Sequence, residues 1–140
     1  MLSQRSEKRG IIKMASKYLN KRTVVNGIEF QSRKEARRYQ ELLVLLNAGE
    51  ISDLRLQVPY ELIPAQKEPP TIGSKGGVHP GKTIERSVVY VADFVYKDKN
   101  GQEIVEDVKG YRKADAGAYR IFAIKRKLML WKFGISVKEV

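Results

Sequence analysis

The sequence predicts a mixed α/β (α+β) fold, in which helices flank one central mixed sheet. Apolar residues recur at helical spacing in two segments, residues 32–49 and 115–133. Four further segments are typical of strands because they alternate in polarity or are apolar throughout: residues 57–63, 86–97, 102–109 and 135–140. The expected order is therefore helix, strand, strand, strand, helix, strand.

The first helix has clear end signals. Ser32 is a good N-cap, and Glu35 three residues later completes a capping box. Gly49 is suited to the position just after the helix. In the second helix Gly134 is the expected stop, and four side chains form the apolar stripe expected to face the core: Ile121, Ile124, Leu128 and Trp131.

The rest of the chain divides by composition. Residues 1–22 carry seven Lys or Arg and one acid, which predicts a mobile basic arm. Residues 23–140 have the length of one domain with a single core, beginning with an extended segment that turns at Asn26-Gly27. Residues 64–85 are rich in Pro and Gly, which predicts a long flexible loop inside that domain.

The bulk composition narrows the class of protein. Hydrophobic residues make up 42% of the 140 positions and charged residues 31%, which is typical of a globular protein. No apolar run approaches the roughly 20 residues needed to span a bilayer, and no signal-peptide core follows the basic N-terminus. There is no cysteine, which excludes disulfides and thiol catalysis and makes the cytoplasm the expected compartment.

The net charge of +11, from 27 basic and 16 acidic residues, favours a polyanionic partner, most commonly nucleic acid. An anionic membrane surface or a merely soluble basic protein are the alternatives. The single histidine, His79, argues against histidine-based metal sites and triads and is expected to be an ordinary loop residue.

Asp93 is the most informative residue, because its strand is apolar on both faces. Val89, Val91 and Val95 lie on one face, and the apolar residues that alternate with them on the other are Tyr90, Ala92 and Phe94. A lone carboxylate in such a strand costs several kcal/mol unless it is paired or bound to a metal. Asp93 is therefore expected to be a functional group.

The next strand offers a partner for it. Alternation places Asp107 and Lys109 on one face, with Glu106 on the other as a supporting group or a partner for a basic residue. Asp107 can hold a hard divalent cation, and Lys109 can orient water or stabilise charge on a phosphate.

The turn between these strands decides whether the acids meet. A two-residue loop at Asn100-Gly101 would oppose Asp93 to Val108 and put the two acids on opposite faces. A three-residue loop, residues 99–101, opposes Asp93 to Asp107 and needs a left-handed residue at its third place, which Gly101 supplies. We predict the three-residue loop, with a cation between two carboxylates that would otherwise repel each other.

Glu35 is the fourth candidate ligand. It lies on the apolar stripe of the first helix, from which an acid can reach a metal site. Its place in the capping box is the alternative explanation, so both roles stay open.

An Asp on one strand and Asp-x-Lys on the next, between an acidic and a basic helix, resembles the PD-(D/E)XK nuclease superfamily. The motifs are YVADFVY (residues 90–96) and VEDVKG (residues 105–110), and the resemblance covers roughly residues 30–140. Ala92 stands where the motif's name has proline. The chain is more narrowly similar to small phage and prophage nuclease-like proteins, some of them Holliday-junction-resolvase-like.

The resemblance implies a restriction-endonuclease-like core and Mg²⁺- or Mn²⁺-dependent DNA cleavage, with Asp93, Asp107, Lys109 and Glu35 in the active site. It also implies a phage- or prophage-encoded protein in a bacterial cytoplasm, a homodimer, and a branched-DNA or Holliday-junction substrate. Basic residues that bracket the acidic cluster are the expected phosphate contacts. They are Arg33, Lys34, Arg37, Arg112, Lys113, Arg120, Lys125 and Lys127.

Two alternatives to a DNA endonuclease remain at this point. One is a non-catalytic DNA-binding protein that keeps the nuclease fold, against which the intact Asp93, Asp107 and Lys109 argue. The other is an RNA-processing nuclease, against which the absence of an aromatic RNA-binding sheet motif argues.

Overall fold

The structure is a computed structural model that describes residues 22–110 and 116–140. The expected basic arm, apart from Arg22, lies outside the described residues, as do Arg112 and Lys113. The chain divides into two compact units, Met1–Ser52 and Asp53–Val140. Among the described residues, no helix is long and apolar enough to cross a membrane.

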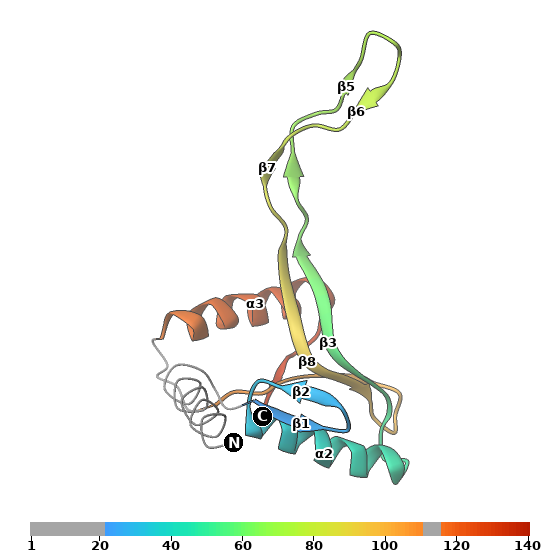
Figure 1. Cartoon of the computed structure of the whole chain (residues 1–140), viewed down its shortest axis with the longest axis vertical. Coiled ribbons are helices and arrows are strands. Elements are labelled where there is room, and N and C mark those ends of the chain that lie inside the picture. Colours follow the sequence, from blue (N-terminus) through green and yellow to red (C-terminus); the bar gives the residue numbers. More distant parts are fainter. Residues whose placement is uncertain (1–21, 111–115) are drawn as a thin grey trace, which may run out of the picture. The chain divides into compact units, whose positions relative to one another are not determined.

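The first unit contains a short hairpin and a capped helix. Strands β1 (Thr23–Val25) and β2 (Ile28–Phe30) pair antiparallel around the expected turn, in which Asn26 and Gly27 have φ of 51° and 77°. Helix α2 (Arg33–Asn47) follows (Figure 1). The Ser32 Oγ accepts a hydrogen bond from the Glu35 backbone N–H, and Gly49 follows the helix with φ of 75°. The predicted cap and stop are therefore confirmed.

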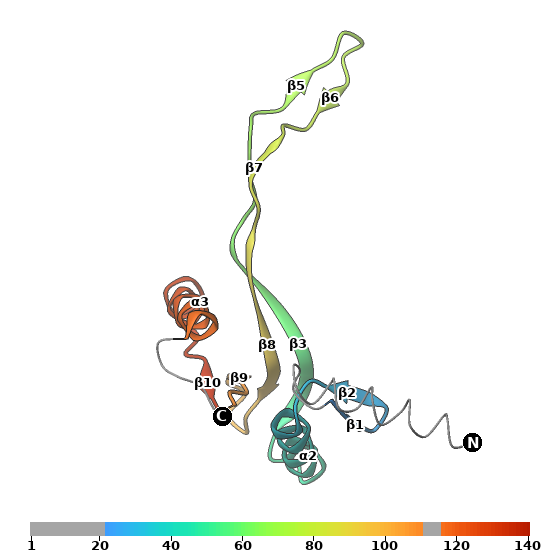
Figure 2. The ribbon, with the colours of Figure 1, turned by 60° about the vertical axis from the view of Figure 1, so that its left-hand side comes forward.

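The second unit is built on a four-stranded sheet in the order β10-β9-β8-β3. Strand β8 pairs antiparallel with β9, and β10 pairs parallel with β9, so the sheet is mixed as expected and the α+β class is confirmed. Figure 2 shows β10 and β9 beside each other with α3 nearby. The elements are β3 (Ser52–Ile63), β8 (Val88–Lys97), β9 (Glu103–Asp107), α3 (Gly117–Phe133) and β10 (Lys138–Glu139).

Helix α3 covers one face of this sheet, but with a different side from the one expected. Phe122 and Met129 are buried in a core that also contains Tyr90, Val95 and Val105. The expected core stripe is largely exposed, with 58%, 58% and 81% of the surface of its members accessible: Ile121, Ile124 and Trp131. The expectation was wrong because the helix is apolar on two opposite sides, so periodicity alone selects either one. The ring of Phe122 lies 6.2 Å from that of Tyr90, which favours the observed side.

Residues 64–85 also differ from the expected unstructured loop. They form a two-stranded ribbon in which β4 (Gln66–Lys67) pairs with β7 (Thr83–Glu85) and β5 (Thr71–Ile72) pairs with β6 (Val78–His79), both antiparallel. Figure 1 shows this ribbon continuing from β3 and β8. The prolines fall between the short strands, where no ladder hydrogen bond is lost, and the glycines form the turn and the close contacts. The prolines and glycines therefore interrupt the ribbon between its short strands but do not prevent it from forming.

Candidate active site

The turn between β8 and β9 fixes the register of the candidate site. The paired residues of the two strands run from Lys97↔Glu103 to Phe94↔Glu106, and the same register continued by one residue places Asp93 opposite Asp107. The backbone N–H of Asp98 donates to the Gln102 carbonyl at 3.0 Å, which encloses a three-residue loop. Gly101 ends that loop with φ of 77°. The predicted loop and register are therefore confirmed, and the two-residue loop is excluded.

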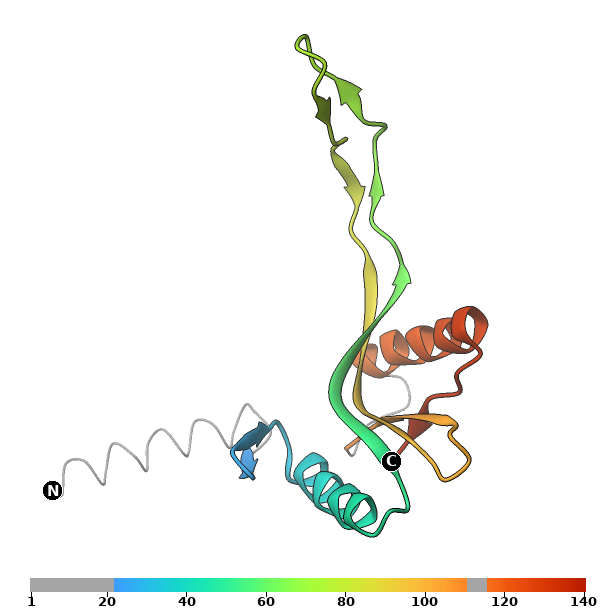
Figure 3. The same ribbon diagram turned by 90° about the vertical axis from the view of Figure 1, so that its right-hand side faces the viewer.

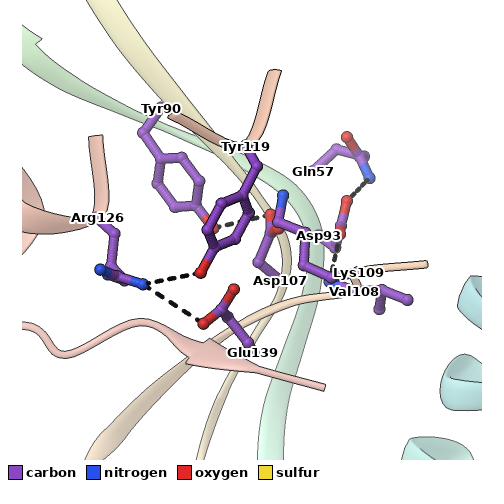
Figure 4. Close-up of polar contacts among 9 residues, drawn as sticks. All are labelled: Gln57, Tyr90, Asp93, Asp107, Val108, Lys109, Tyr119, Arg126 and Glu139. Atoms are coloured by element: carbon purple, nitrogen blue, oxygen red, sulfur yellow. Dashed lines mark hydrogen bonds and ion pairs between the residues drawn. The ribbon is translucent and has the colours of Figure 1, made fainter. Parts of the chain in front are cut away.

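Asp93 is held by two donors from neighbouring strands (Figure 4). Its Oδ2 accepts a hydrogen bond from the Val108 backbone N–H at 2.8 Å, and its Oδ1 accepts one from Gln57 Nε2 at 3.2 Å. The carboxylate therefore takes the place that a backbone carbonyl would have in the ladder beyond Glu106. This contact ties the position of Asp93 directly to the strand that carries Asp107 and Lys109.

Asp107 is 5% exposed and is held from three directions. The Tyr90 hydroxyl donates to Oδ1 at 3.0 Å, and the Lys109 ammonium forms an ion pair with Oδ2, which accepts no hydrogen bond from the described residues. Its backbone carbonyl accepts from Val140 N–H, and Lys109 N–H donates to the Val140 carbonyl, both at 3.0 Å. Strand β10 therefore fixes the backbone of the Asp-Val-Lys segment.

Lys109 lies between the acid and an aromatic ring. Its Nζ is 3.7 Å from the centroid of the Phe122 ring on α3, while it pairs with Asp107 on the other side. The packing of α3 on the sheet thus helps to orient the lysine. Figure 4 shows Lys109 beside both Asp107 and Asp93.

The electrostatics of the site follow from this crowding. Burial raises the pKa of the Asp93 carboxyl, and the negative charge of Asp107 raises it further. Hydrogen bonds from Val108 and Gln57 and the positive charge of Lys109 oppose that rise in pKa without cancelling it. Burial and the charge of Asp107 also raise the pKa of the Tyr90 hydroxyl, so this group remains a hydrogen-bond donor at neutral pH.

Gln57 and Tyr90 belong to the site, although the sequence analysis did not select them. Gln57 lies on β3 with φ of 52°, a left-handed conformation that is strained for a residue of this type. No spacing rule relates residue 57 to residue 93, because the whole ribbon separates them in the chain. Tyr90 was assigned only to the apolar surface of its strand, because a hydropathy pattern treats tyrosine as apolar and ignores its hydroxyl group.

Glu35, the fourth candidate, belongs to the first unit. The structure confirms the Ser32 half of the capping box, since the Glu35 backbone N–H donates to Ser32 Oγ at 3.1 Å, and the Glu35 side chain is buried. A role of Glu35 as a metal ligand stays a prediction. Glu106 is fully buried and accepts a hydrogen bond from the Tyr96 hydroxyl at 2.6 Å, which is consistent with a supporting position.

The donor set of the site fits magnesium or manganese, although it is small. In the described part of the chain, no group of three His, Cys, Asp or Glu side chains is arranged to hold a metal ion. Asp93 and Asp107 nevertheless supply two carboxylates with oxygen atoms of the hard type that Mg²⁺ prefers. Mg²⁺ commonly binds through one or two carboxylates, with water and substrate phosphate completing its shell. The two acids are therefore the residues that would hold the ion.

The basic residues expected to contact DNA lie in both units. Arg33, Lys34 and Arg37 are exposed in the first turns of α2, and Arg120 and Lys127 are exposed on α3, where Lys125 is partly buried. Two neighbouring cations have internal roles instead. Arg126 contacts Tyr119 and Glu139, each at 3.5 Å, and Lys132 donates to the Glu61 carbonyl at 2.8 Å.

Fold and site together define an α+β protein that carries a pair of carboxylates and a lysine on its central antiparallel strands. Residues 15–138 match the family DUF1064, described as "Protein of unknown function", and the chain belongs to that family. No curated protein and no solved structure matches the chain.

Proposed function

We propose that the protein is a metal-dependent endonuclease that hydrolyses phosphodiester bonds in DNA. One observation carries the proposal: the β8–β9 register opposes Asp93 to Asp107, and Lys109 pairs with Asp107 at the same place. A buried acid, a partly buried acid and a cation that share one small volume are costly for folding alone, so their presence together favours a chemical role.

Each residue has a distinct task in this proposal. Asp93 and Asp107 would bind Mg²⁺ or Mn²⁺, which would supply charge stabilisation at the phosphate. Val108 N–H and Gln57 keep the Asp93 carboxylate aimed into the site, and Tyr90 does the same for Asp107. The Lys109 ammonium would orient the attacking water or stabilise the negative charge that grows on the phosphate oxygens.

Branched DNA, and a four-way junction in particular, is the substrate that we favour, with a homodimer as the active form. The support is the resemblance to small phage nucleases, together with the net charge of +11. A dimer suits a junction because two strands of it must be cut.

A cleavage panel tests the proposal. Labelled duplex, flap, single-stranded and four-way junction DNA would be incubated with the protein in Mg²⁺, in Mn²⁺ and in EDTA. We expect cleavage that requires the metal and that Asp107→Asn reduces by about a thousandfold or more while DNA binding is kept. The matched control is Glu103→Gln, which removes an exposed acid of the same strand and should cleave like the wild type.

Three results would contradict the proposal. Cleavage that survives Asp107→Asn would mean that another site or a contaminant is responsible. Cleavage of none of the four DNAs would favour a non-catalytic DNA-binding protein. Stronger competition by structured RNA than by DNA junctions would favour the RNA-processing alternative.

A further inference from the structure

The ribbon between β3 and β8, which we call the β-arm and define as residues 64–87, has no core of its own. Every residue in it is exposed except Gly73 and Gly81, which are partly covered. An isolated two-stranded hairpin is at best marginally stable in water, because neither face buries apolar surface. A ribbon of this length is therefore expected to contact something outside the chain. Figure 3 shows the β-arm running away from the sheet and α3 of its unit.

The conformation of the β-arm is nevertheless closely specified. The backbone N–H of Glu68 donates to the Lys82 carbonyl at 2.8 Å, beside Gly81. A Cβ atom on Gly81 would lie 1.8 Å from the Glu68 carbonyl oxygen, so only glycine fits where the two strands approach each other this closely. At the tip, Gly73 N–H donates to the Gly77 carbonyl at 2.8 Å around a three-residue loop, residues 74–76.

The side chains of the β-arm indicate which partner it fits. Its charged residues are four basic and two acidic, with Lys75 in the tip loop; they are Lys67, Lys75, Lys82, Arg86, Glu68 and Glu85. Ile72 and Val78 form a cross-strand pair next to the tip and are 77% and 71% exposed. Basic residues along a ribbon suit a phosphate backbone, and small apolar side chains suit the edges of bases, including the thymine methyl group.

The dimensions agree with a DNA groove. The major groove of B-DNA admits a two-stranded β-ribbon if no helix or second sheet covers the faces of that ribbon. Each strand of the β-arm has about 12 residues and spans roughly 40 Å, close to one helical turn of duplex. Strands β3 and β8 carry Gln57 and Asp93 and lead directly into the β-arm, so one pair of strands joins the candidate site to the ribbon.

We propose that the β-arm binds double-stranded DNA by lying in a groove, about one helical turn from the site of cleavage. This inference rests on the proposed function in taking DNA as the substrate, and it adds that the flanking duplex is read by a dedicated ribbon. Lys75 and Lys82 contact phosphates, and the Ile72–Val78 pair lies against the bases.

Binding without cleavage tests the β-arm separately from catalysis. The full chain would be titrated against a fluorescent duplex of about three helical turns in EDTA, over a range of salt concentrations. We expect Lys75→Gln/Lys82→Gln to weaken binding at least tenfold near 0.1 M salt and to reduce the salt slope by about 2. The matched control, Lys97→Gln/Lys99→Gln, removes the same charge from the end of β8 and the turn that follows it, and should change affinity less than threefold.

A second pair of variants tests the shape of the β-arm without altering its charge. Gly81→Ala brings a Cβ against the Glu68 carbonyl and should weaken duplex binding at least tenfold. Gly77→Ala meets nothing within 4 Å and should bind like the wild type. Far-ultraviolet circular dichroism and the melting temperature should be alike in the two variants, because the β-arm adds nothing to the core.

The outcomes distinguish the two proposals. Wild-type affinity in both lysine pairs, or an equal loss in both, would overturn the role of the β-arm. If the β-arm variants bind DNA like the wild type but differ from it in sedimentation coefficient, the proposal would also be overturned. The β-arm would then be a contact between protein molecules. If no DNA is cleaved but binding depends on the β-arm, the nuclease proposal fails alone. If Asp107→Asn abolishes cleavage while the β-arm variants bind normally, the β-arm proposal fails alone.

Discussion

Two hairpins of this protein have the same turn and opposite surroundings. The β8–β9 hairpin turns through residues 99–101 and the tip of the β-arm through residues 74–76, and each three-residue loop ends in a left-handed glycine, Gly101 with φ of 77° and Gly76 with φ of 81°. Beyond the turn, the first hairpin buries Val95 and Val105 almost completely, while the second exposes Ile72 and Val78. The turn sets the register in both, but only the first hairpin has a core that enforces it.

The difference explains where a costly group is tolerated. Asp107 can be buried, with 5% of its surface exposed, because its neighbours and a paired strand on each side hold it in place. The two carboxylates on the β-arm, Glu68 and Glu85, are exposed and lack such support. The buried hairpin therefore fits the proposed catalytic role, and the exposed one fits the proposed contact with DNA.

Truncating one valine in each hairpin gives the largest expected contrast. Val105→Ala leaves a cavity in the core and should lower the free energy of unfolding by about 2 kcal/mol. Val78→Ala is on the exposed pair and should change it by less than about 0.5 kcal/mol. Urea denaturation followed by circular dichroism measures both, and equal losses would mean that the β-arm is buried in solution.

Exchanging the left-handed glycine of each turn should have a smaller effect. Alanine is disfavoured at positive φ by about 1 kcal/mol, and Gly101→Ala transmits that cost to the folded sheet. Gly76→Ala meets nothing within 4 Å and perturbs only the tip, so global stability should not change. Melting temperatures decide the matter, and a larger loss for Gly76→Ala would show that the β-arm folds together with the core.

Local rules predicted the parts of the fold that depend on neighbours in sequence. The Ser32 cap, the stop at Gly49 and the turn at Gly101 all follow from backbone preferences of single residues. The pairing of Asp93 with Asp107 was predictable because only two loop lengths were possible, and they differ by one residue in the turn. These features were predictable because few alternatives compete with them.

The features that were missed depend on contacts between distant segments. Helix α3 is apolar on two sides, and only the shape of the sheet beneath Phe122 and Met129 selects between them. The β-arm was expected to be a loop because a high content of proline and glycine usually indicates that a segment has no regular structure. Here these residues lie between the short strands or in the turn, where they are compatible with a ribbon. Gln57 was missed because its role comes from a strained backbone and a partner 36 residues away.

The smallest expected effect concerns the strand that leads from the candidate site into the β-arm. Asp53 and Gln57 both have φ of 52° on β3, so glycine at either position should relieve a similar backbone strain. Of the two, Gln57 contacts Asp93, so only its replacement should affect the candidate site. Asp53→Gly should raise the free energy of unfolding by up to about 1 kcal/mol and leave cleavage unchanged. Gln57→Gly should gain less stability, because it also removes a hydrogen bond to the partly buried Asp93.

Cleavage as a function of pH separates a positioning role of Gln57 from a structural one. The Gln57 hydrogen bond lowers the pKa of Asp93 against the rise caused by burial, so its loss should raise that pKa further. Because a metal-binding carboxylate must be ionised, the acidic limb of the pH–rate profile should then move to higher pH in Gln57→Gly and stay in place in Asp53→Gly. A severalfold loss of rate at neutral pH should accompany the shift, and identical profiles for the two variants would show that Gln57 stabilises β3 without positioning the acid.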